Sequence, residues 1–331
     1  MAKGPNQKAK LLFLMRILCE RTDEDHPMTI AQLSEALGEY GISAERKSLY
    51  DDIEVLRYFG VDVVSRRDKT YGYYVGERDF ELAELKILVD AVQSSKFITH
   101  RKSNELIKKI EGLTSVYGAR QLDRQVYVSN RIKNANESIY YLIDYIHRAI
   151  SEDSSILFKY TVWLPSKEKM QKKSGQDYKI SPWALCWDDE SYYMIGYDTD
   201  AQIIKHFRVD KMENIRLTGE KRDGYEHFKM FDMGAYSKKM FGMFNGEEEH
   251  VTLVCDNSLA GVIIDRFGKD ITITSVDENR FRISVKVAVS PQFFAWVFSF
   301  GDMIEITSPK AVSDKMLEMI KTAEKKYSKR K

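Results

Sequence analysis

The sequence that decides the fold of the first part of the chain runs from residue 29 to residue 60: TIAQLSEALGEYGISAERKSLYDDIEVLRYFG. Apolar residues recur at helical spacing on both sides of a central turn at Gly41. Thr29 and Gln32 have the spacing of a Thr-x-x-Gln capping box. Ser43 stands where it can cap a second helix, and Gly60 where it can end it. The stretch therefore predicts two short helices joined by a turn.

The flanking sequence adds a helix before this pair and a hairpin after it. Leu14 and Leu18 recur at helical spacing upstream. Two short runs rich in β-branched and aromatic residues, 61–65 and 73–75, are joined by a polar turn. This order of elements over residues 1–76 is that of a winged helix-turn-helix, in which the last helix lies in the major groove of DNA.

Polar and cationic side chains of this region are the candidate DNA contacts, because they can reach phosphates and base edges. The candidates are Thr29, Ser43, Arg46, Lys47, Ser48, Tyr50, Arg66, Arg67 and Lys69. The alternative interpretation is that they are solvated charges on a small helical domain. Residues 1–76 hold 11 Lys and Arg against 12 Asp and Glu, so DNA binding here depends on the placement of charges and not on a net field.

The composition is that of a soluble protein with more than one folded unit. The chain has 331 residues, of which 43% are hydrophobic and 31% charged, and its formal net charge is +1. Cys19, Cys186 and Cys255 are far apart in the sequence, which favours a reducing compartment over a disulfide framework. We find neither an export signal nor a membrane-spanning apolar run, so we expect a cytoplasmic protein.

The hydrophobic period changes several times after residue 76, and each change predicts a boundary. Helical spacing gives way near residue 151 to short alternating runs separated by tight turns, which predict a small antiparallel barrel. The order βαββαβ after residue 247 predicts a ferredoxin-like unit. The predicted α+β multidomain chain consists of a winged helix-turn-helix (1–76), a helical linker (77–150), the barrel (151–222), a bridge (223–246) and a C-terminal domain (247–331).

Aromatic and cationic residues gather in the predicted barrel. Residues 180–197 read ISPWALCWDDESYYMIGY, and the next strand carries Lys205-His-Phe-Arg208. Aromatic faces and guanidinium groups together can bind a planar anion such as a nucleotide, by stacking and charge-assisted hydrogen bonds. The alternative is that alternating aromatic residues simply form the core of the barrel. The lysines at positions 167, 169, 172 and 173 are interpreted as part of a mobile solvated loop.

This stretch resembles the WYL domain of bacterial transcription regulators. Tyr192-Tyr193-Met194 stands for the Trp-Tyr-Leu motif, Ser181-Pro182 precedes it, and Lys205-His-Phe-Arg-Val-Asp-Lys211 follows as the basic strand of that family. The sequence departs from the pattern with Tyr for Trp, Met for Leu, and Lys for Arg at 205 and 211. These changes weaken a bidentate role at 205 and 211 and leave Arg208 intact.

The resemblance extends over nearly the whole chain. Residues 43–60 resemble the recognition helix of the winged helix-turn-helix that usually precedes a WYL domain, and residues 247–327 resemble its C-terminal WCX extension. The family implies an Sm-like, or SH3-like, barrel that senses a ligand, in some members single-stranded nucleic acid, and a homodimer bound to double-stranded DNA. The candidate ligand-binding residues are Tyr160, Ser181, Tyr192, Tyr193, Lys205, His206 and Arg208.

We therefore expect a cytoplasmic, ligand-responsive transcription regulator that binds a duplex operator as a homodimer and senses a nucleotide or single-stranded nucleic acid. An accessory nucleic-acid-binding module that modulates a partner nuclease or defence complex remains the alternative. We expect no enzyme, cofactor or metal, because the sequence has no Gly-rich phosphate loop or nucleophile elbow and its six histidines lack metal-ligand spacing. An enzyme acting on nucleotides ranks last among the three hypotheses.

Overall fold

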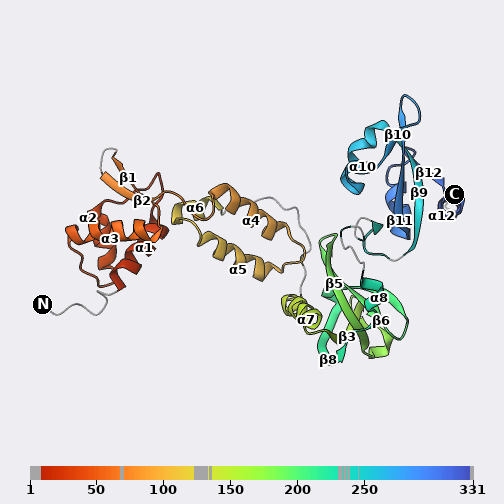
Figure 1. Cartoon of the computed structure of the whole chain (residues 1–331), viewed down its shortest axis with the longest axis horizontal. Helices are drawn as coiled ribbons and strands as arrows, with labels where there is room; N and C mark the ends of the chain where they lie inside the picture. Colours follow the sequence, from red (N-terminus) through yellow and green to blue (C-terminus); the bar gives the residue numbers. More distant parts are fainter. Residues whose placement is uncertain are drawn as a thin grey trace. The chain divides into compact units, whose positions relative to one another are not determined.

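The computed structural model divides the chain into two compact units, residues 1–137 and 138–331, which we describe separately (Figure 1). The structure describes residues 9–67, 71–122, 133, 136–229, 234, 236, 239–244 and 246–328. One candidate DNA contact, Lys69, lies outside the described residues.

The first unit begins with three helices and an antiparallel hairpin, in the order that the sequence predicts. The elements are α1 (Lys10–Arg21), α2 (Ile30–Gly38), α3 (Arg46–Phe59), β1 (Val63–Arg67) and β2 (Tyr71–Val75). The apolar faces of the helices meet in one core, where Leu14, Leu33 and Leu49 are completely buried. Burial of these stripes holds the short helices together, because helices of this length are marginal in isolation.

Two of the three predicted helix ends in this region are confirmed. At the start of α2 the Gln32 amide donates to the Thr29 hydroxyl and the Thr29 amide donates to the Gln32 side chain, which completes the capping box. Gly60 ends α3 with a left-handed φ of 108°. The prediction that Ser43 caps α3 is wrong, because the helix begins three residues later with Glu45 as its N-cap residue.

The late start of α3 has a physical cause in the preceding turn. Ile42 is buried in the core of the unit, and its amide donates to the carbonyl of Leu37 at 3.1 Å. The chain must remain non-helical here to turn that side chain inward, so the helix begins only after the turn is complete.

Three further helices occupy the rest of the described part of this unit. They are α4 (Leu82–Ser94), α5 (His100–Glu111) and α6 (Val116–Leu122). They pack on one another around a small core that contains Leu85, Val89 and Leu122. The Ser115 hydroxyl donates to Asp23 at 2.6 Å, which ties the start of α6 to the loop after α1.

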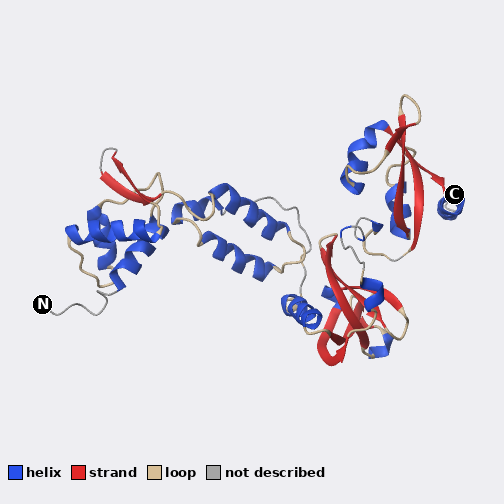
Figure 2. Cartoon of the chain, in the orientation of Figure 1, coloured by secondary structure: helices blue, strands red, loops and turns tan. Residues whose placement is uncertain are grey.

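The second unit begins with a curled antiparallel sheet. Its strands are β3 (Ser154–Trp163), β4 (Lys169–Gln171), β5 (Tyr178–Asp188), β6 (Ser191–Asp198), β7 (Ile203–Arg208) and β8 (Met212–Lys221). The strand order is β4-β3-β5-β6-β7, and β8 also pairs with β3. Figure 2 shows the strong curvature that makes this sheet a half-barrel. α7 (Ile139–Ser151) packs its apolar face on β3, β5 and β8, with Ile139 and Ile146 completely buried.

The lysines after β3 are exposed to solvent, as interpreted, but part of this segment forms a strand and not a loop. β4 pairs with the end of β3, with Trp163 opposite Lys169 and Thr161 opposite Gln171. The Lys172 amide then donates to the carbonyl of Tyr160 at 2.8 Å. The lysines are therefore held on a hairpin, and alternation alone did not reveal it because the strand has only three residues.

The chain ends in an antiparallel sheet covered by helices. The elements are β9 (Glu247–Asp256), α10 (Ala260–Phe267), β10 (Ile273–Ser275), β11 (Arg280–Val289), α11 (Pro291–Phe298), β12 (Ile304–Ser308) and α12 (Lys310–Ser328). The strand order is β10-β11-β9-β12. Ser290 caps α11 by accepting from the Phe293 amide, and Pro291 is its first residue. A core of aliphatic and aromatic side chains, with Phe293 and Ile263 fully buried, lies between the sheet and the helices.

Among the residues that the structure describes, no helix is long and apolar enough to cross a bilayer. α12 is the longest of them at 19 residues, and it is rich in lysine and glutamate.

Candidate ligand pocket

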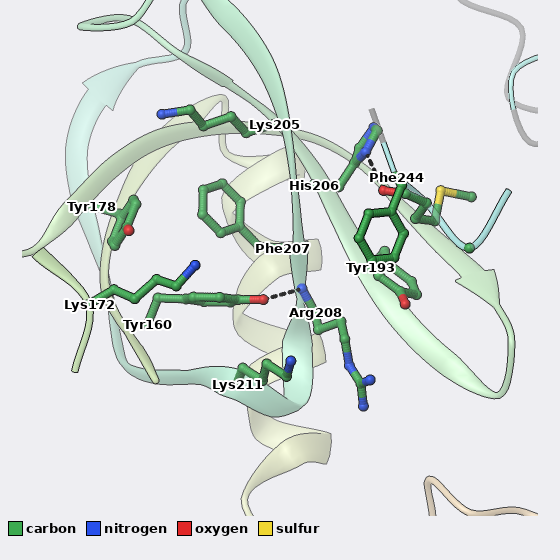
Figure 3. A pocket seen from close by; sticks show the side chains of 12 residues that line it. Tyr160, Lys172, Tyr178, Tyr193, Lys205, His206, Phe207, Arg208, Lys211 and Phe244 are labelled. Atoms are coloured by element: carbon green, nitrogen blue, oxygen red, sulfur yellow. Dashed lines mark hydrogen bonds between the residues drawn. The ribbon is translucent and has the colours of Figure 1, made fainter. Parts of the chain in front are cut away.

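A pocket of about 490 Å³ opens on the curled sheet (Figure 3). Its walls come from β3, the segment after β4, the start of β5, β6, β7 and a segment that follows the sheet in sequence. The lining residues are Tyr160, Lys172, Tyr178, Tyr193, Lys205, His206, Phe207, Arg208, Lys211, Gly242, Met243 and Phe244. The pocket thus combines aromatic rings with four cationic side chains, three lysines and one arginine.

The aromatic side of the pocket is a packed cluster. The rings of Tyr160 and Tyr178 both meet the Phe207 ring edge-on at 5.4 Å, and Phe158 packs behind Phe207 at 5.0 Å. The Tyr160 hydroxyl accepts a hydrogen bond from the Arg208 amide at 3.2 Å. Burial raises the pKa of Tyr160 to about 12, so the phenol is neutral at physiological pH. Phe158, Phe207 and Tyr178 are buried, so the half-buried Tyr160 ring is the one in this cluster on which a planar ligand can stack.

Two of the pocket's cations already have carboxylate partners. The Arg208 guanidinium makes a bidentate pair with Asp210, with Nε to Oδ1 at 3.0 Å and Nη2 to Oδ2 at 2.8 Å. The Lys205 ammonium lies 2.5 Å from Oδ2 of Asp198, whose side chain is only 3% exposed. An anionic ligand must compete with these carboxylates for both cations, which lowers the affinity that either one contributes.

The other two cations have no carboxylate within ion-pair distance among the described residues, and the sequence analysis placed neither of them in the site. The Lys172 ammonium lies 5.9 Å from the centre of the Tyr160 ring. Burial, together with the neighbouring Arg208, lowers the pKa of Lys211. Lys211 is the last residue of the family motif but was not among the candidate ligand residues, and Lys172 belongs to the segment that was interpreted as a loop. The fold brings the two lysines together in one pocket.

His206 holds one wall of the pocket in place. Its Nδ1 lies 2.9 Å from the carbonyl oxygen of Met243, and its Nε2 lies 2.8 Å from the hydroxyl of Tyr236. A carbonyl only accepts, so Nδ1 carries the proton and donates. Burial lowers the pKa of His206, which favours the neutral ring, and Nε2 then accepts from the Tyr236 hydroxyl. Both ring nitrogens are therefore engaged by the chain that follows the sheet.

The pocket brings together five of the candidate ligand residues, Tyr160, Tyr193, Lys205, His206 and Arg208. Ser181 and Tyr192 lie elsewhere. Ser181 is buried, accepts from the Asp223 amide at 2.8 Å and contacts Ser155. Tyr192 packs against Trp187 with ring centres 4.7 Å apart. Seven further lining residues were not among the candidates, namely Lys172, Tyr178, Phe207, Lys211, Gly242, Met243 and Phe244.

The candidate DNA contacts in the first unit differ in how far they face solvent. Arg46, Lys47 and Tyr50 are exposed at the start of α3, and Arg46 Nε donates to the Tyr50 hydroxyl at 3.2 Å. Ser48 is half-buried and accepts from Lys10, whose ammonium also pairs with Asp52 at 2.5 Å.

The remaining described candidates lie around α2 and in the hairpin. The Thr29 side chain is used in the capping box, and Ser43 is exposed in the turn before α3. On β1 both Arg66 and Arg67 are exposed, and Arg66 also donates to the carbonyl of Glu24 at 3.2 Å. Three of the candidate side chains on α3 and two on β1 therefore present an open polar surface.

The described residues contain no group of three or more His, Cys, Asp or Glu side chains that could hold a metal ion. The fold and the pocket define a multidomain α+β protein with a half-barrel that carries an aromatic and cationic pocket. Family models make this specific: the WYL domain matches residues 142–217 and the WCX domain matches residues 247–323. The chain carries a WYL domain followed by a WCX domain, and the family predicted from the sequence is confirmed.

Solved structures give only distant likenesses. Proteasome accessory factor B/C (PafBC) of Arthrobacter aurescens is 19% identical over 95% of this chain, with a TM-score of 0.28. The match covers 46% of that chain, so this chain spans about half the length of its relative. A CRISPR Cas-related protein is 11% identical over 75% of this chain and 73% of its own, with a TM-score of 0.36. No curated protein sequence matches this chain.

Proposed function

We propose that this protein is a ligand-responsive transcription regulator, in which the pocket of the WYL domain binds an anionic ligand and the first unit binds a duplex operator as a homodimer. The chain performs no chemical step in this proposal. One observation carries the ligand half: Lys172 and Lys211 line the pocket without a carboxylate within ion-pair distance among the described residues, and Lys211 is half-buried while Lys172 is exposed beside the Tyr160 ring. The half-buried charge of Lys211 is costly without an ion-pair partner, and a bound anion offsets that cost.

A second, open cavity favours an extended anion over a single nucleotide. It is lined by Leu164 and by residues 169–175, and it shares Lys172 with the pocket. Lys173 lies over the Tyr178 ring at 4.2 Å, and Lys169 over Trp163 at 5.6 Å. Alternating aromatic faces and cations along a groove are typical of proteins that bind single-stranded nucleic acid. We therefore propose a single-stranded oligonucleotide as the ligand class.

The DNA half of the proposal rests on α3 and the β1–β2 hairpin. We propose that residues 1–76 are a winged helix-turn-helix whose exposed Arg46, Lys47 and Tyr50 contact the major groove while Arg67 contacts the backbone from the hairpin. The strand order β10-β11-β9-β12 supports a ferredoxin-like fold for the WCX domain. The protein would act in the cytoplasm, where its operator is found.

Fluorescence anisotropy with a labelled oligothymidylate of about 10 nucleotides tests the ligand half. Lys211→Ala removes one charge-assisted contact, so we expect the Kd to rise by about tenfold or more. Lys179→Ala is the matched control, because Lys179 pairs with Glu220 at 2.6 Å and does not line the pocket. Equal affinities of the two variants would show that the pocket is not the binding site.

A salt series on duplex DNA tests the other half. Duplex from upstream of the gene is compared with a scrambled duplex of equal length, and a preference of about a thousandfold supports an operator-binding regulator. Arg46→Ala should weaken duplex binding and reduce the salt slope by about one if Arg46 contacts a phosphate. Strong single-strand binding without any duplex preference would instead favour an accessory module.

A further inference from the structure

We propose that the segment Met240–Phe244 relays occupancy of the pocket to the core of the WCX domain, with His206 and Tyr236 as the positioning residues that hold it. This relay rests on the proposed function, because it needs a ligand in the pocket. The relay specifies which part of the second unit responds when the ligand binds. The segment lies in the part of the chain between the two family-model matches.

One end of the segment is anchored in the WCX domain. Phe241 is 5% exposed and belongs to the same core as the residues of β9, β11 and α11. Its ring centre lies 5.3 Å from those of Phe293 and Trp296, both on α11. Arg266 of α10 lies over the same ring at 4.1 Å and donates to the carbonyl of Met240. Phe241 therefore cannot shift without disturbing α10 and α11.

The other end of the segment is a wall of the pocket. Gly242, Met243 and Phe244 line it, and the Phe244 side chain is 50% exposed (Figure 3). The Met243 carbonyl accepts from His206 of β7, so this wall is fastened to the strand that also carries Arg208. The Tyr236 hydroxyl forms a hydrogen bond with Nε2 of His206, and this contact fixes the orientation of the imidazole ring.

The segment between these two ends is short and constrained. Gly242 and Met243 both have left-handed backbone conformations, with φ of 60° and 55°. The Met240 and Met243 side chains are buried in one cluster with Cys186 and Ile195 of the half-barrel and Ala288 of β11. The buried side chains of Met240 and Met243 hold the backbone on both sides of Gly242, so a displacement at Phe244 passes to Phe241 instead of being absorbed between them.

The ligand must prefer one arrangement of the segment for the relay to operate, because equal affinity for two states shifts neither. Contact with Phe244 and Met243 supplies that preference, since these residues belong to the wall and not to the rigid strands. Occupancy should therefore change the protection of amides in α11, which does not line the pocket.

Hydrogen–deuterium exchange of the full chain with and without saturating oligothymidylate measures this directly. We expect the probe to slow exchange in residues 291–298 by about fivefold or more, within the usual range of coupling between sites.

Two substitutions separate the relay from binding. Tyr236→Phe removes one hydroxyl outside the pocket, so the Kd for the probe should stay within about threefold while the slowing in 291–298 falls by at least half. Tyr192→Phe is the matched control and should keep the full response. An Asn at position 206 places its amide group near the position of Nδ1 and can donate to the Met243 carbonyl. A Gln places its amide group near the position of Nε2 instead. His206→Asn should therefore keep more of the response than His206→Gln, although both fill similar space.

Each outcome bears on the relay in a definite way. Binding of the probe without a change in residues 291–298 overturns the relay and leaves the proposed function standing. Equal responses of Tyr236→Phe and the unsubstituted protein overturn the positioning role. A chain that binds no probe at all overturns the proposed function and the relay together.

Discussion

The start of α3 and the pocket of the WYL domain are both candidate nucleic-acid sites, but their cations differ in solvent exposure and in pairing with carboxylates. Arg46 and Lys47 on α3 are exposed to solvent, whereas Arg208 and Lys205 in the pocket are half-buried and paired with carboxylates. Exposed charges are strongly screened by salt and tolerate small displacements, while buried ones are screened less and depend on geometry. The first arrangement suits a long repetitive polyanion, and the second suits a ligand of defined shape.

The largest expected effect is the destabilisation of the second unit while the first unit stays folded. Phe158 is completely buried against Phe207 and Tyr178, so Phe158→Ala should lower the free energy of unfolding of the second unit by about 3–5 kcal/mol. All four tryptophans, Trp163, Trp183, Trp187 and Trp296, lie in that unit, so the urea midpoint from tryptophan fluorescence reports on it.

Leu49→Ala in the core of α3 is the matched variant for this experiment. It should leave the tryptophan midpoint unchanged while lowering stability in far-UV circular dichroism by about 2–5 kcal/mol. A shift of the tryptophan midpoint by Leu49→Ala would mean that the two units unfold as one.

The next effect sharpens the contrast between paired and unpaired cations. Asp210→Asn removes the charge that holds Arg208, so the Kd for oligothymidylate should fall by about tenfold, a gain of about 1.4 kcal/mol. Asp177→Asn, at a carboxylate that pairs with Arg216 outside the pocket, should have no such effect. If Asp210→Asn together with Arg208→Ala keeps the gain, Arg208 is not the cation that the ligand contacts.

A smaller effect compares two helix caps. Thr29→Ala removes the hydroxyl that accepts from the Gln32 amide and should destabilise the first unit by about 1 kcal/mol. Ser290→Ala removes the equivalent acceptor for the Phe293 amide and should cost the second unit a similar amount. Circular dichroism and tryptophan fluorescence, respectively, follow the two losses. A cost well above 1 kcal/mol at Ser290, which is 2% exposed, would point to packing rather than capping.

The smallest expected effect is a dependence on pH that only the pocket should have. Because burial lowers the pKa of His206 in the folded state, the unfolded chain takes up a proton first as the pH falls. Stability of the second unit should therefore be complete above about pH 6.5 and decline below it, as the tryptophan midpoint measures. His206→Asn should flatten this decline, whereas His250→Asn, at an exposed position on β9, should leave it in place.

The sequence predicts what local chemistry determines. The capping box at Thr29 and the end of α3 at Gly60 are both present, because each depends on residues within one helical turn. β3, β5, β6 and β7 follow from alternation in the same way, whereas the three-residue β4 does not. The start of α3 differs from the prediction because burial of Ile42, a tertiary contact, overrides the cap at Ser43.

The pocket itself was only partly predictable. Tyr193 and Arg208 were found because the family motif marks the strands that carry them. Lys172 was missed because a three-residue strand folds its hairpin onto Tyr160. Phe244 was missed because it approaches β7 from far along the chain, and no periodicity within a strand reports such a contact.

The wall formed by residues 242–244 also limits how this chain can be recombined. The segment that the WYL family model matches ends at residue 217, so a domain exchange cut at that boundary would transfer the strands of the half-barrel without one side of its pocket. His206 would then face a foreign sequence in place of Met243 and Tyr236. In protein engineering, the segment that must be transferred with this pocket therefore extends past the matched domain to residue 244.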